Sequence, residues 1–548
     1  MLGGFVPWPR ELQQEYVERG YWQELTIGEM LDRSADHFAN REALVHEDLR
    51  ITYADLKGRA DRLATHMLNM GLRAGDVVIV QLPNIPEFVF TYFACVKIGV
   101  VPVMCLAQHR EHEISYIADL VKAKGYVFEG SFRKFDYVAL AKKVKQDVDS
   151  MQYLFAVGNG GQEGVISVGD LLEEPAEIEG DGEDLASFRP SPYEIAVFQL
   201  SGGTTGMPKV IPRTHNDYLY NSELSGAIAG LNMYSVFLAT TPLPHNFALA
   251  SPGIQAVFQR GGKIVIPESH RPEHVFAVVE NESVTYVPAV PPMIINWLNS
   301  PDIDQYDLNS WEVIINGGAK LTPEVAARVE PLLGCRLQQI FGMAEGLLVM
   351  TELDDLPEVI RETVGTPISP ADDVRILNDD GSALPVGEVG EMACRGPYTI
   401  RGYFGAPEHN QKAFTEDGFF KSGDVMRIRP DGHMVVEGRK KDLINRGGEK
   451  INAEEVEDLI LAHPDVENAA VVAMPDPVMG ERTCAYVIMK PEKEISLQEL
   501  CEFMLGKNIA KLKLPERLEI VGEFPLTNVG KVSKKELRRD IEARLDNG

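Results

Sequence analysis

The chain has 548 residues, of which 44% are hydrophobic and 25% are charged, the balance of an ordinary soluble globular protein. Its formal net charge of −29 argues against a general nucleic-acid or anionic-membrane surface, because phosphates would be repelled. At about 100–200 residues per domain, the length predicts roughly three or four folding units.

The six cysteines are scattered, and no two of them form a C-x-x-C pair. This pattern predicts neither a disulfide framework nor a zinc site. The first residues, MLGGFVPWPREL, contain no basic segment followed by a long apolar one, so no signal peptide is expected. No apolar run approaches the roughly 20 residues that a membrane helix needs. We therefore expect a soluble, cytoplasmic protein.

The first half of the chain alternates helical and extended patterns. Residues 51–72 have apolar side chains at helical spacing, with Thr52 as N-cap and Gly71 at the C-terminal end. Residues 77–82 form a continuous apolar run, typical of a strand buried on both faces. A helical segment, 86–98, and a short strand, 100–104, follow. Repeated strand–helix–strand units predict parallel α/β sheets with helices on both sides.

The second half changes character. Residues 370–437 contain turn signals such as NDDG and PDG between short apolar runs, and predict a β-rich region. A basic cluster follows Gly438, and then comes an α+β pattern with helices near 453–462 and 496–506 and strands near 469–474 and 483–489. We place a domain boundary at 438–441, with a large domain over 1–438 and a small one over 439–548.

The most informative segment is SGGTTGMPK, residues 201–209, which follows an apolar strand-like run. Glycines let backbone N–H groups approach an anion without a side-chain clash. The hydroxyls of Ser201, Thr204 and Thr205 add donors, and Lys209 adds a positive charge. The spacing is not that of a Walker A loop. Taken alone, the segment predicts either a phosphate-binding loop or a flexible Gly/Ser/Thr loop.

This segment resembles the signature loop of the acyl-adenylate-forming superfamily, and five further motifs follow in the family's order. They are PLPHNF (242–247, substrate pocket), QIFGMAE (339–345, adenine and magnesium), KSGD (421–424, ribose), GRKKD (438–442, hinge) and PLTNVGK (525–531, catalytic lysine). Six ordered motifs are far more specific than any one of them. The resemblance implies a large N-terminal α/β domain with a β-rich subdomain, and a small mobile α+β C-terminal domain.

The resemblance also implies an ATP site. Phe341 would stack on the adenine, or else serve only in core packing, and the Asp424 carboxylate would accept from the ribose hydroxyls, or else lie in a surface turn. The implied nucleotide-binding residues are Ser201, Gly202, Gly203, Thr204, Thr205, Gly206, Lys209, Gly317, Gly318, Ala319, Gln339, Phe341, Gly342, Met343, Asp424 and Arg439.

Catalysis is assigned, by the same resemblance, to Lys531, Glu345 and His245. Lys531 would stabilise charge on the α-phosphate and the attacking carboxylate, although by position alone it would be a solvated lysine. Glu345 is a hard oxygen ligand suited to Mg²⁺ on a phosphate. Lys441 is the implied hinge residue between the adenylating and thioester-forming states.

A narrower resemblance is to the aryl-acid ligases of siderophore synthesis, carried by VPWPR (6–10), IPRTHNDY (211–218) and HNFALASPG (245–253). It implies 2,3-dihydroxybenzoate as the best substrate, with salicylate or another hydroxylated aryl acid left open. The implied acid-binding residues are Asn246, Phe247, Ser251, Gly318 and Leu348. Relatives usually have tyrosine at 247 and valine at 348, so the shape of the pocket floor differs here.

The expected acceptor is the phosphopantetheine thiol of a separate aryl-carrier protein, because no carrier motif follows Lys531. Coenzyme A is the competing acceptor. A non-catalytic nucleotide-binding protein of the same fold is a further alternative, and it is disfavoured because Lys531 and Glu345 are both present.

Overall fold

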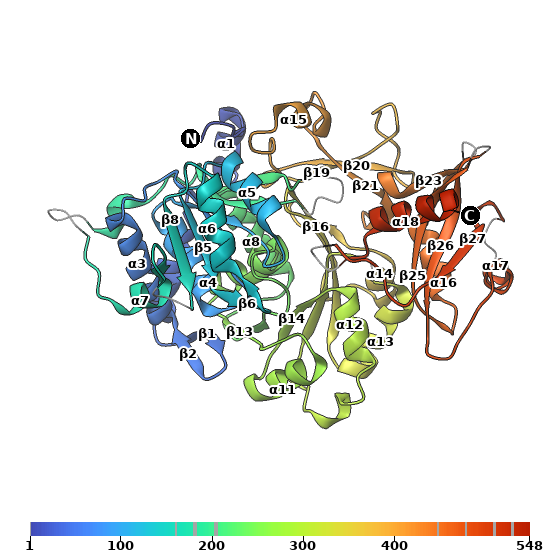
Figure 1. The fold of residues 1–548 in the computed structure, drawn as a ribbon, viewed down its shortest axis with the longest axis horizontal. Coiled ribbons are helices and arrows are strands. Elements are labelled where there is room, and N and C mark those ends of the chain that lie inside the picture. The colour runs from blue at the N-terminus through green and yellow to red at the C-terminus, as the bar shows by residue number, and fades with distance from the viewer. Residues whose placement is uncertain are drawn as a thin grey trace. The chain divides into compact units, whose positions relative to one another are not determined.

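The computed structural model describes residues 2–158, 162–178, 184–201, 207–319, 321–446, 449–476, 479–507, 511–527 and 531–547 (Figure 1). Packing separates two compact units. Unit 1 contains Met1–Ser201, Met207–Asp373 and Cys394–Phe420, and unit 2 contains Val374–Ala393 and Lys421–Gly548. Part of the predicted β-rich region thus packs with the C-terminal segment. The boundary at 438–441 concerns domain motion and stays a prediction.

The first sheet of unit 1 is mainly parallel. Its strands, in spatial order, are β11 (Val210–Thr214), β10 (Ile195–Leu200), β4 (Val101–Met104), β3 (Val77–Gln81), β5 (Gly125–Glu129), β8 (Tyr153–Val157) and β9 (Ile166–Ser167). Only the pair β10–β11 is antiparallel among the pairs described. Every residue of β3 is buried, as the continuous apolar run predicts.

Helices cover both faces of this sheet, as the alternating pattern predicts. Val78 and Val80 of β3 pack in one core with α3 (Tyr53–Asn69) and α4 (Pro86–Lys97). Val77 and Ile79 pack in a second core with α5 (Glu111–Leu120) and α6 (Tyr137–Asp147), the helices in front of β5 in Figure 1. Thr52 caps α3 as expected, and its hydroxyl accepts from the Asp55 N–H.

The second sheet of unit 1 has parallel strands at its centre and antiparallel strands at its edges. Its spatial order is β18 (Thr366–Pro367), β17 (Gly346–Met350), β16 (Arg336–Met343), β15 (Val313–Asn316), β14 (Tyr286–Ala289), β12 (Val236–Leu238), β13 (Lys263–Ile266), β1 (Glu42–His46) and β2 (Leu49–Thr52). The hairpin β16–β17 lies near one edge and carries the predicted adenine and magnesium motif.

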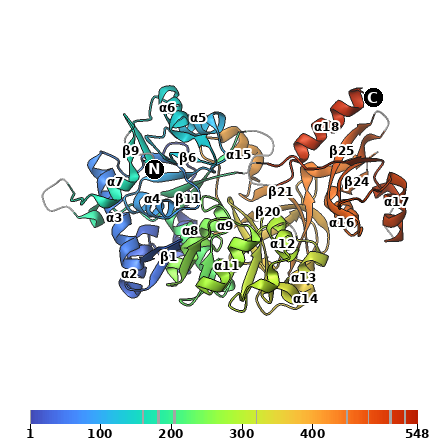
Figure 2. The same cartoon turned by 60° about the horizontal axis from the view of Figure 1, so that its bottom comes forward.

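Helices also cover both faces of the second sheet. One face packs against α11 (Pro272–Glu282), α12 (Pro291–Leu298) and α13 (Pro323–Leu333), which lie together in Figure 2. Each of the three begins with a proline, whose fixed φ and missing N–H suit the first helical turn. The large core of unit 1 fills the other face with α2 (Ile27–Phe38), α8 (His215–Ile228) and α10 (Gly253–Gln259).

Unit 1 also has several shorter elements. These are α1 (Arg10–Glu18), α7 (Val168–Glu173), α9 (Asn246–Ala250), α14 (Pro357–Glu362), α15 (Pro407–Ala413), β6 (Ser131–Phe132) and β7 (Phe135–Asp136). The predicted α/β class is confirmed. In the described part of the chain, no helix combines the length and the apolar character needed to span a bilayer.

The C-terminal half contains two further sheets. A four-stranded antiparallel sheet consists of β19 (Asp373–Leu377), β20 (Val389–Arg395), β21 (Phe420–Ile428) and β22 (Met434–Arg439). A five-stranded sheet consists of β24 (Glu449–Asn452), β23 (Leu443–Arg446), β26 (Gly480–Met489), β25 (Val466–Asp476) and β27 (Arg517–Ile520).

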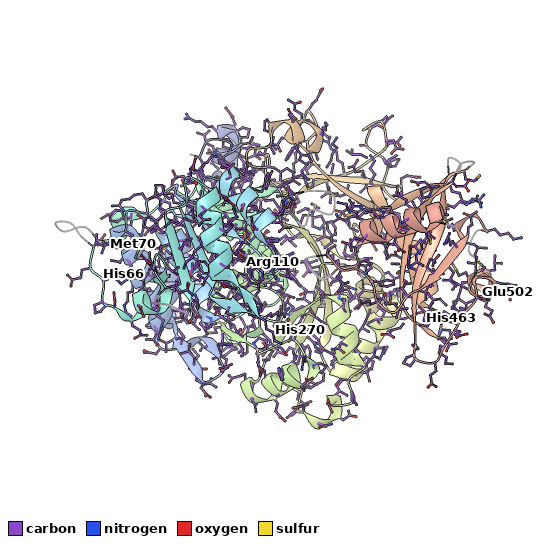
Figure 3. All side chains as sticks on the ribbon, in the orientation of Figure 1. His66, Met70, Arg110, His270, His463 and Glu502 are labelled. Carbon is purple, nitrogen blue, oxygen red and sulfur yellow. The ribbon has the colours of Figure 1, made fainter. Side chains whose placement is uncertain are left out.

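The five-stranded sheet of unit 2 is covered by helices on both faces. Val471 of β25 faces α16 (Ala453–Leu461) and α17 (Leu497–Gly506), whereas its neighbour Val472 packs with α18 (Lys534–Asn547). The His463 ring, labelled in Figure 3, packs edge-on against Phe503 of α17 with 4.7 Å between ring centroids. The predicted α+β character of this region is therefore observed.

Candidate active site

The base of the predicted phosphate loop is the β10–β11 hairpin. Ser201 N–H donates to the Lys209 carbonyl at 3.0 Å, and Lys209 N–H donates to Ser201 Oγ at 3.0 Å. These two bonds hold together the ends of the segment that contains Gly202, Gly203, Thr204, Thr205 and Gly206, predicted site residues that lie outside the described residues. The Lys209 ammonium lies 5.4 Å from the centroid of the Tyr403 ring.

Glu345 occupies the turn of the β16–β17 hairpin and is half-buried. The Tyr403 hydroxyl donates to Glu345 Oε1 at 2.7 Å, so one tyrosine contacts both Glu345 and Lys209. The next residue, Gly346, has φ +143°, and a Cβ there would lie 2.5 Å from Thr399 Cα. Only glycine therefore allows this turn to pack so closely, and the packing fixes the position of Glu345.

Arg213, on β11, holds the Glu345 turn in place by a hydrogen bond. Its Nη1 donates to the Ala344 carbonyl at 2.8 Å, and its Nε donates to Asp217 Oδ1 at 2.7 Å. Both charged side chains are fully buried. Burial raises the pKa of Asp217, and Arg213 offsets this in part. A buried pair of this kind is strongly destabilising to break, because one charge is left uncompensated.

The predicted Gly317–Gly318–Ala319 segment follows β15 and lies against the acid-binding motif. A Cβ on Gly317 would lie 2.9 Å from Phe247 Cζ and 3.0 Å from Ile340 Cγ2. Gly318 has φ +80°, which favours glycine. Asn316 Nδ2 donates to the Ala319 carbonyl at 3.0 Å and to Gln339 Oε1 at 2.8 Å. Two predicted nucleotide-binding segments are thus joined by one amide.

The end of β16 carries Phe341, Gly342 and Met343. Phe341 and Met343 are half-buried, and Gly342 is exposed. Gly342 pairs across the hairpin with Leu348, and a Cβ at Gly342 would lie 2.5 Å from Leu348 Cδ2. The predicted adenine segment and the predicted pocket-lining leucine are therefore in contact.

Three of the five predicted acid-binding residues lie at the short helix α9. Asn246, Phe247 and Ser251 are 5%, 8% and 1% exposed, so this corner is buried. Asn246 Nδ2 donates to Ser251 Oγ at 3.1 Å. His245 is exposed at the N-cap of α9, where its Nδ1 accepts from the Phe247 N–H at 3.2 Å. The close approach of Phe247 to Gly317 brings a predicted acid-binding residue next to a predicted nucleotide-binding residue.

Within unit 2, Asp424 and Arg439 lie opposite one another on β21 and β22. The Arg439 Nε and Asp424 Oδ1 atoms are 2.8 Å apart, and Asp424 is 3% exposed. Asp424 N–H also donates to Ser422 Oγ at 3.0 Å. The two predicted ribose-binding residues are therefore adjacent, and their role toward the nucleotide stays a prediction.

Lys531 is exposed beside a short loop closed by the bridge between Leu526 and Val532. Thr527 N–H donates to the Lys531 carbonyl at 2.6 Å. Lys441, the predicted hinge residue, lies in the 3-10 turn Lys440–Asp442, and its side chain is outside the described residues. Asp442 Oδ1 accepts from Arg538 Nη1 of α18 at 2.9 Å.

Sequence reasoning missed Tyr403 and Tyr218, which contact the predicted site residues Glu345 and Asn246. It also missed Arg213, which contacts Ala344 of the QIFGMAE motif. Tyr403 is 58 positions from its partner Glu345, and no local pattern links them. Arg213 and Tyr218 lie in the IPRTHNDY segment, which resembles aryl-acid ligases. This resemblance was the one sign in the sequence that the segment matters for the site, but it assigned no role to Arg213 or Tyr218.

Comparison with known proteins agrees with this geometry. The family model for AMP-binding enzymes matches residues 31–404, and the model for the AMP-binding enzyme C-terminal domain matches residues 455–531. The chain is 43% identical to the 2,3-dihydroxybenzoate-AMP ligase of Bacillus subtilis, over 100% of this chain and 99% of that protein.

It is also 43% identical to the salicylyl-CoA synthase / salicylate adenylyltransferase of a Streptomyces species, over 99% of this chain and 98% of that one. The solved apo structure of Mycobacterium smegmatis MbtA is 36% identical, with a TM-score of 0.75 over 98% of both chains. The chain therefore belongs to the AMP-binding enzyme family, the acyl-adenylate-forming superfamily that its six motifs resemble.

Proposed function

We propose that the protein uses ATP to convert a hydroxylated aryl acid, best 2,3-dihydroxybenzoate, into aryl-AMP, and then transfers the aryl group to a phosphopantetheine thiol for siderophore synthesis. The observation that carries the proposal is the buried pair Asn246–Ser251 beside the Phe247 ring, held against the Gly317 turn of the nucleotide motif. The names of the Bacillus and Streptomyces relatives support an aryl acid.

The reaction joins the two halves of this site. A carboxylate oxygen of the acid attacks the α-phosphorus of ATP, the bond to the bridging oxygen breaks, and pyrophosphate leaves. Ser201 and Lys209 supply a hydroxyl and a positive charge at the base of the phosphate loop. Lys531 stabilises the negative charge that develops on the reacting oxygens. The thiol then attacks the acyl carbon, and AMP leaves.

The pocket chemistry favours a phenol over an amino acid. A substrate ammonium needs a nearby carboxylate, because a buried unpaired charge is costly. Asn246 and Ser251 offer neutral donors and acceptors, and Phe247 offers an apolar face. A hydroxylated aromatic ring matches both kinds of surface.

Magnesium fits the donors at the phosphate end. Among the described residues no cluster of three or more His, Cys, Asp or Glu side chains could hold a metal. Mg²⁺ is commonly bound by one or two carboxylates together with substrate phosphates, and Glu345 is a half-buried carboxylate held by Tyr403. When bound there, the ion would neutralise phosphate charge, and Tyr403 would keep the Glu345 carboxylate in place.

The acceptor has two candidates. The resemblance to siderophore ligases favours a separate aryl-carrier protein, whereas the Streptomyces relative is named as a CoA synthase. Incubating the enzyme, ATP and 2,3-dihydroxybenzoate with either a phosphopantetheinylated aryl-carrier domain or CoA separates them. We expect faster thioester formation with the carrier. A higher kcat/KM for CoA would make the chain an aryl-CoA ligase.

Acid-dependent ATP–pyrophosphate exchange tests the first step. The panel contains 2,3-dihydroxybenzoate, salicylate, benzoate, picolinate and several amino acids. We expect the highest kcat/KM with 2,3-dihydroxybenzoate, followed by salicylate. Exchange supported best by an amino acid would overturn the proposed substrate class.

A further inference from the structure

A continuous series of hydrogen bonds lies behind the proposed acid pocket of unit 1. Gln199 Nε2 donates to the Tyr218 hydroxyl at 3.1 Å, and that hydroxyl donates to Asn246 Oδ1 at 2.8 Å. Asn246 Nδ2 then donates to Ser251 Oγ at 3.1 Å. We call Gln199, Tyr218, Asn246 and Ser251 the amide relay. All four are buried, with at most 5% exposure.

A second amide contacts the end of the amide relay. Asn221 Nδ2 donates to Ser251 Oγ at 3.0 Å and to the Ala250 carbonyl at 2.7 Å. A carbonyl can only accept, so the bond to Ala250 fixes which end of the Asn221 amide faces Ser251. Ser251 therefore receives an N–H from Asn221 whatever the state of Asn246.

Tyr218 is held where it can set the direction of the relay. Its ring lies under the buried Arg213 guanidinium, at 4.6 Å from the ring centroid. Burial raises the pKa of Tyr218 above its usual range, so the phenol is neutral and keeps its one proton. That proton points to Asn246 Oδ1, which turns the Asn246 N–H groups toward Ser251.

The hydrogen bonds that Ser251 accepts determine which of its hydrogen-bonding groups can still meet a ligand. A serine hydroxyl has one O–H donor and two acceptor lone pairs. Asn221 and Asn246 occupy both lone pairs. Asn221 Oδ1 has no hydrogen-bond partner among the described residues, so it does not take the Ser251 proton. The O–H of Ser251 is the group that stays available.

We propose that Tyr218 is a positioning residue which, by donating to Asn246, leaves Ser251 able to meet the aryl acid only as a hydrogen-bond donor. This inference rests on the proposed function and on the role that the resemblance to aryl-acid ligases implies for Ser251, which is contact with the 3-hydroxyl of the ring. The pocket then selects a substituent at ring position 3 that accepts a hydrogen bond. A phenol oxygen accepts well, whereas an aromatic amine accepts poorly, because its lone pair is delocalised into the ring.

The opposite direction of the relay makes the opposite prediction. If Tyr218 donated to Gln199, Asn246 would turn its N–H toward Tyr218 and accept from Ser251. Ser251 would then have its proton occupied and one lone pair available. A 3-amino group, which donates, would be bound at least as well as a 3-hydroxyl group.

The test compares two acids of nearly equal size, 2,3-dihydroxybenzoate and 3-amino-2-hydroxybenzoate, by ATP–pyrophosphate exchange. For the wild type we expect kcat/KM to favour the hydroxyl acid by about tenfold, the scale of one buried hydrogen bond. In Tyr218→Phe the Asn246 amide loses the donor that orients it, and the ratio should fall toward one. In Ser251→Ala the ratio should also approach one.

Tyr220→Phe is the matched control. Tyr220 lies on the same helix and is buried, but its hydroxyl bonds Ser369 Oγ at 2.7 Å. This variant should keep the wild-type ratio. Thermal unfolding of each variant accompanies the kinetics. If Tyr218→Phe does not fold, the wild type and Ser251→Ala still decide the direction of the relay.

The outcomes separate this inference from the proposed function. A wild type that uses both aryl acids equally, or prefers the amine, overturns the relay alone. An unchanged ratio in folded Tyr218→Phe likewise overturns the role of Tyr218. A wild type that exchanges best with an amino acid overturns the proposed function itself.

Discussion

The proposed aryl-acid site and the segment around Lys531 are held in different ways. In the pocket, Asn246 and Ser251 are buried and each bonds to two other side chains. Lys531 is exposed and lies beside a short loop closed by backbone bonds. A rigid, buried site suits selection among similar rings, whereas an exposed lysine can take part in one step and leave the next. Mutations at or behind the buried site should therefore lower stability or change selectivity, whereas mutation of Lys531 should slow one step of the reaction.

The largest expected effect on stability comes from the support of the rigid region. Arg213→Met leaves the buried Asp217 carboxylate without its partner and should lower the free energy of unfolding by about 3–5 kcal/mol. Urea unfolding measures this. Arg189→Met is the control, because Arg189 is 45% exposed and pairs with Glu29 at the surface. Its loss should cost about 1 kcal/mol or less. Equal losses in both variants would refute the anchoring role of Arg213.

Substitution of Lys531 should lower the activity of the enzyme without lowering its stability. Lys531→Ala should slow adenylation by about 10²–10³-fold, as for the loss of one charge-stabilising group. Transfer from preformed aryl-AMP should be spared, because the lysine acts only in the first step. Lys511→Ala, which removes another exposed lysine of the same unit, should leave both steps unchanged. Equal loss of both half-reactions in Lys531→Ala would argue against this division.

Ser251→Cys should change selectivity more than rate. A thiol is a weaker donor and acceptor than a hydroxyl, so the advantage of 2,3-dihydroxybenzoate over salicylate should fall by about 1–2 kcal/mol, or roughly tenfold. Competition kinetics with both acids gives the ratio directly. If the ratio does not change, Ser251 does not face the ring. Leu348→Val removes one methylene from the buried side chain next to the site. It should raise kcat/KM for bulkier rings relative to 2,3-dihydroxybenzoate.

A smaller, pH-dependent effect is expected at Asp372. Its Oδ2 accepts from the Tyr398 hydroxyl at 2.6 Å, and that hydroxyl accepts from the Leu348 N–H. Burial raises the pKa of Asp372 to about 7, while Tyr398 lowers it in part. A raised carboxyl pKa means that the folded state holds the proton more tightly, so this contribution to stability falls as pH rises from about 4 to 7. Asp372→Asn should flatten that slope in urea unfolding, and an unchanged slope would assign it to other groups.

The sequence was sufficient for the features that depend on local pattern. The continuous apolar run at β3 and the Thr52 cap of α3 follow from burial and backbone chemistry within a few residues. The six motifs could be named from the sequence because each is contiguous. The β25 and β26 strands, Val466–Asp476 and Gly480–Met489, extend beyond the apolar runs, because strand pairing continues where side chains become polar.

The contacts between distant segments could not be predicted in this way. No periodicity relates Tyr403 to Glu345, or Tyr218 to Asn246, because these bonds depend on how separate strands and helices meet. The grouping of Val374–Ala393 with the C-terminal segment is likewise a property of sheet pairing. The direction of the amide relay follows only after every donor and acceptor has a position.

The central claim, formation of an aryl-AMP, is tested most directly by its product. The enzyme is incubated with ATP, Mg²⁺ and an equimolar mixture of 2,3-dihydroxybenzoate, salicylate and amino acids, without any thiol acceptor. The adenylates are then separated, identified and quantified by mass spectrometry. We predict 2,3-dihydroxybenzoyl-AMP as the main adenylate and its loss in Lys531→Ala. An aminoacyl-AMP as the main product, or no adenylate with any acid, would contradict it.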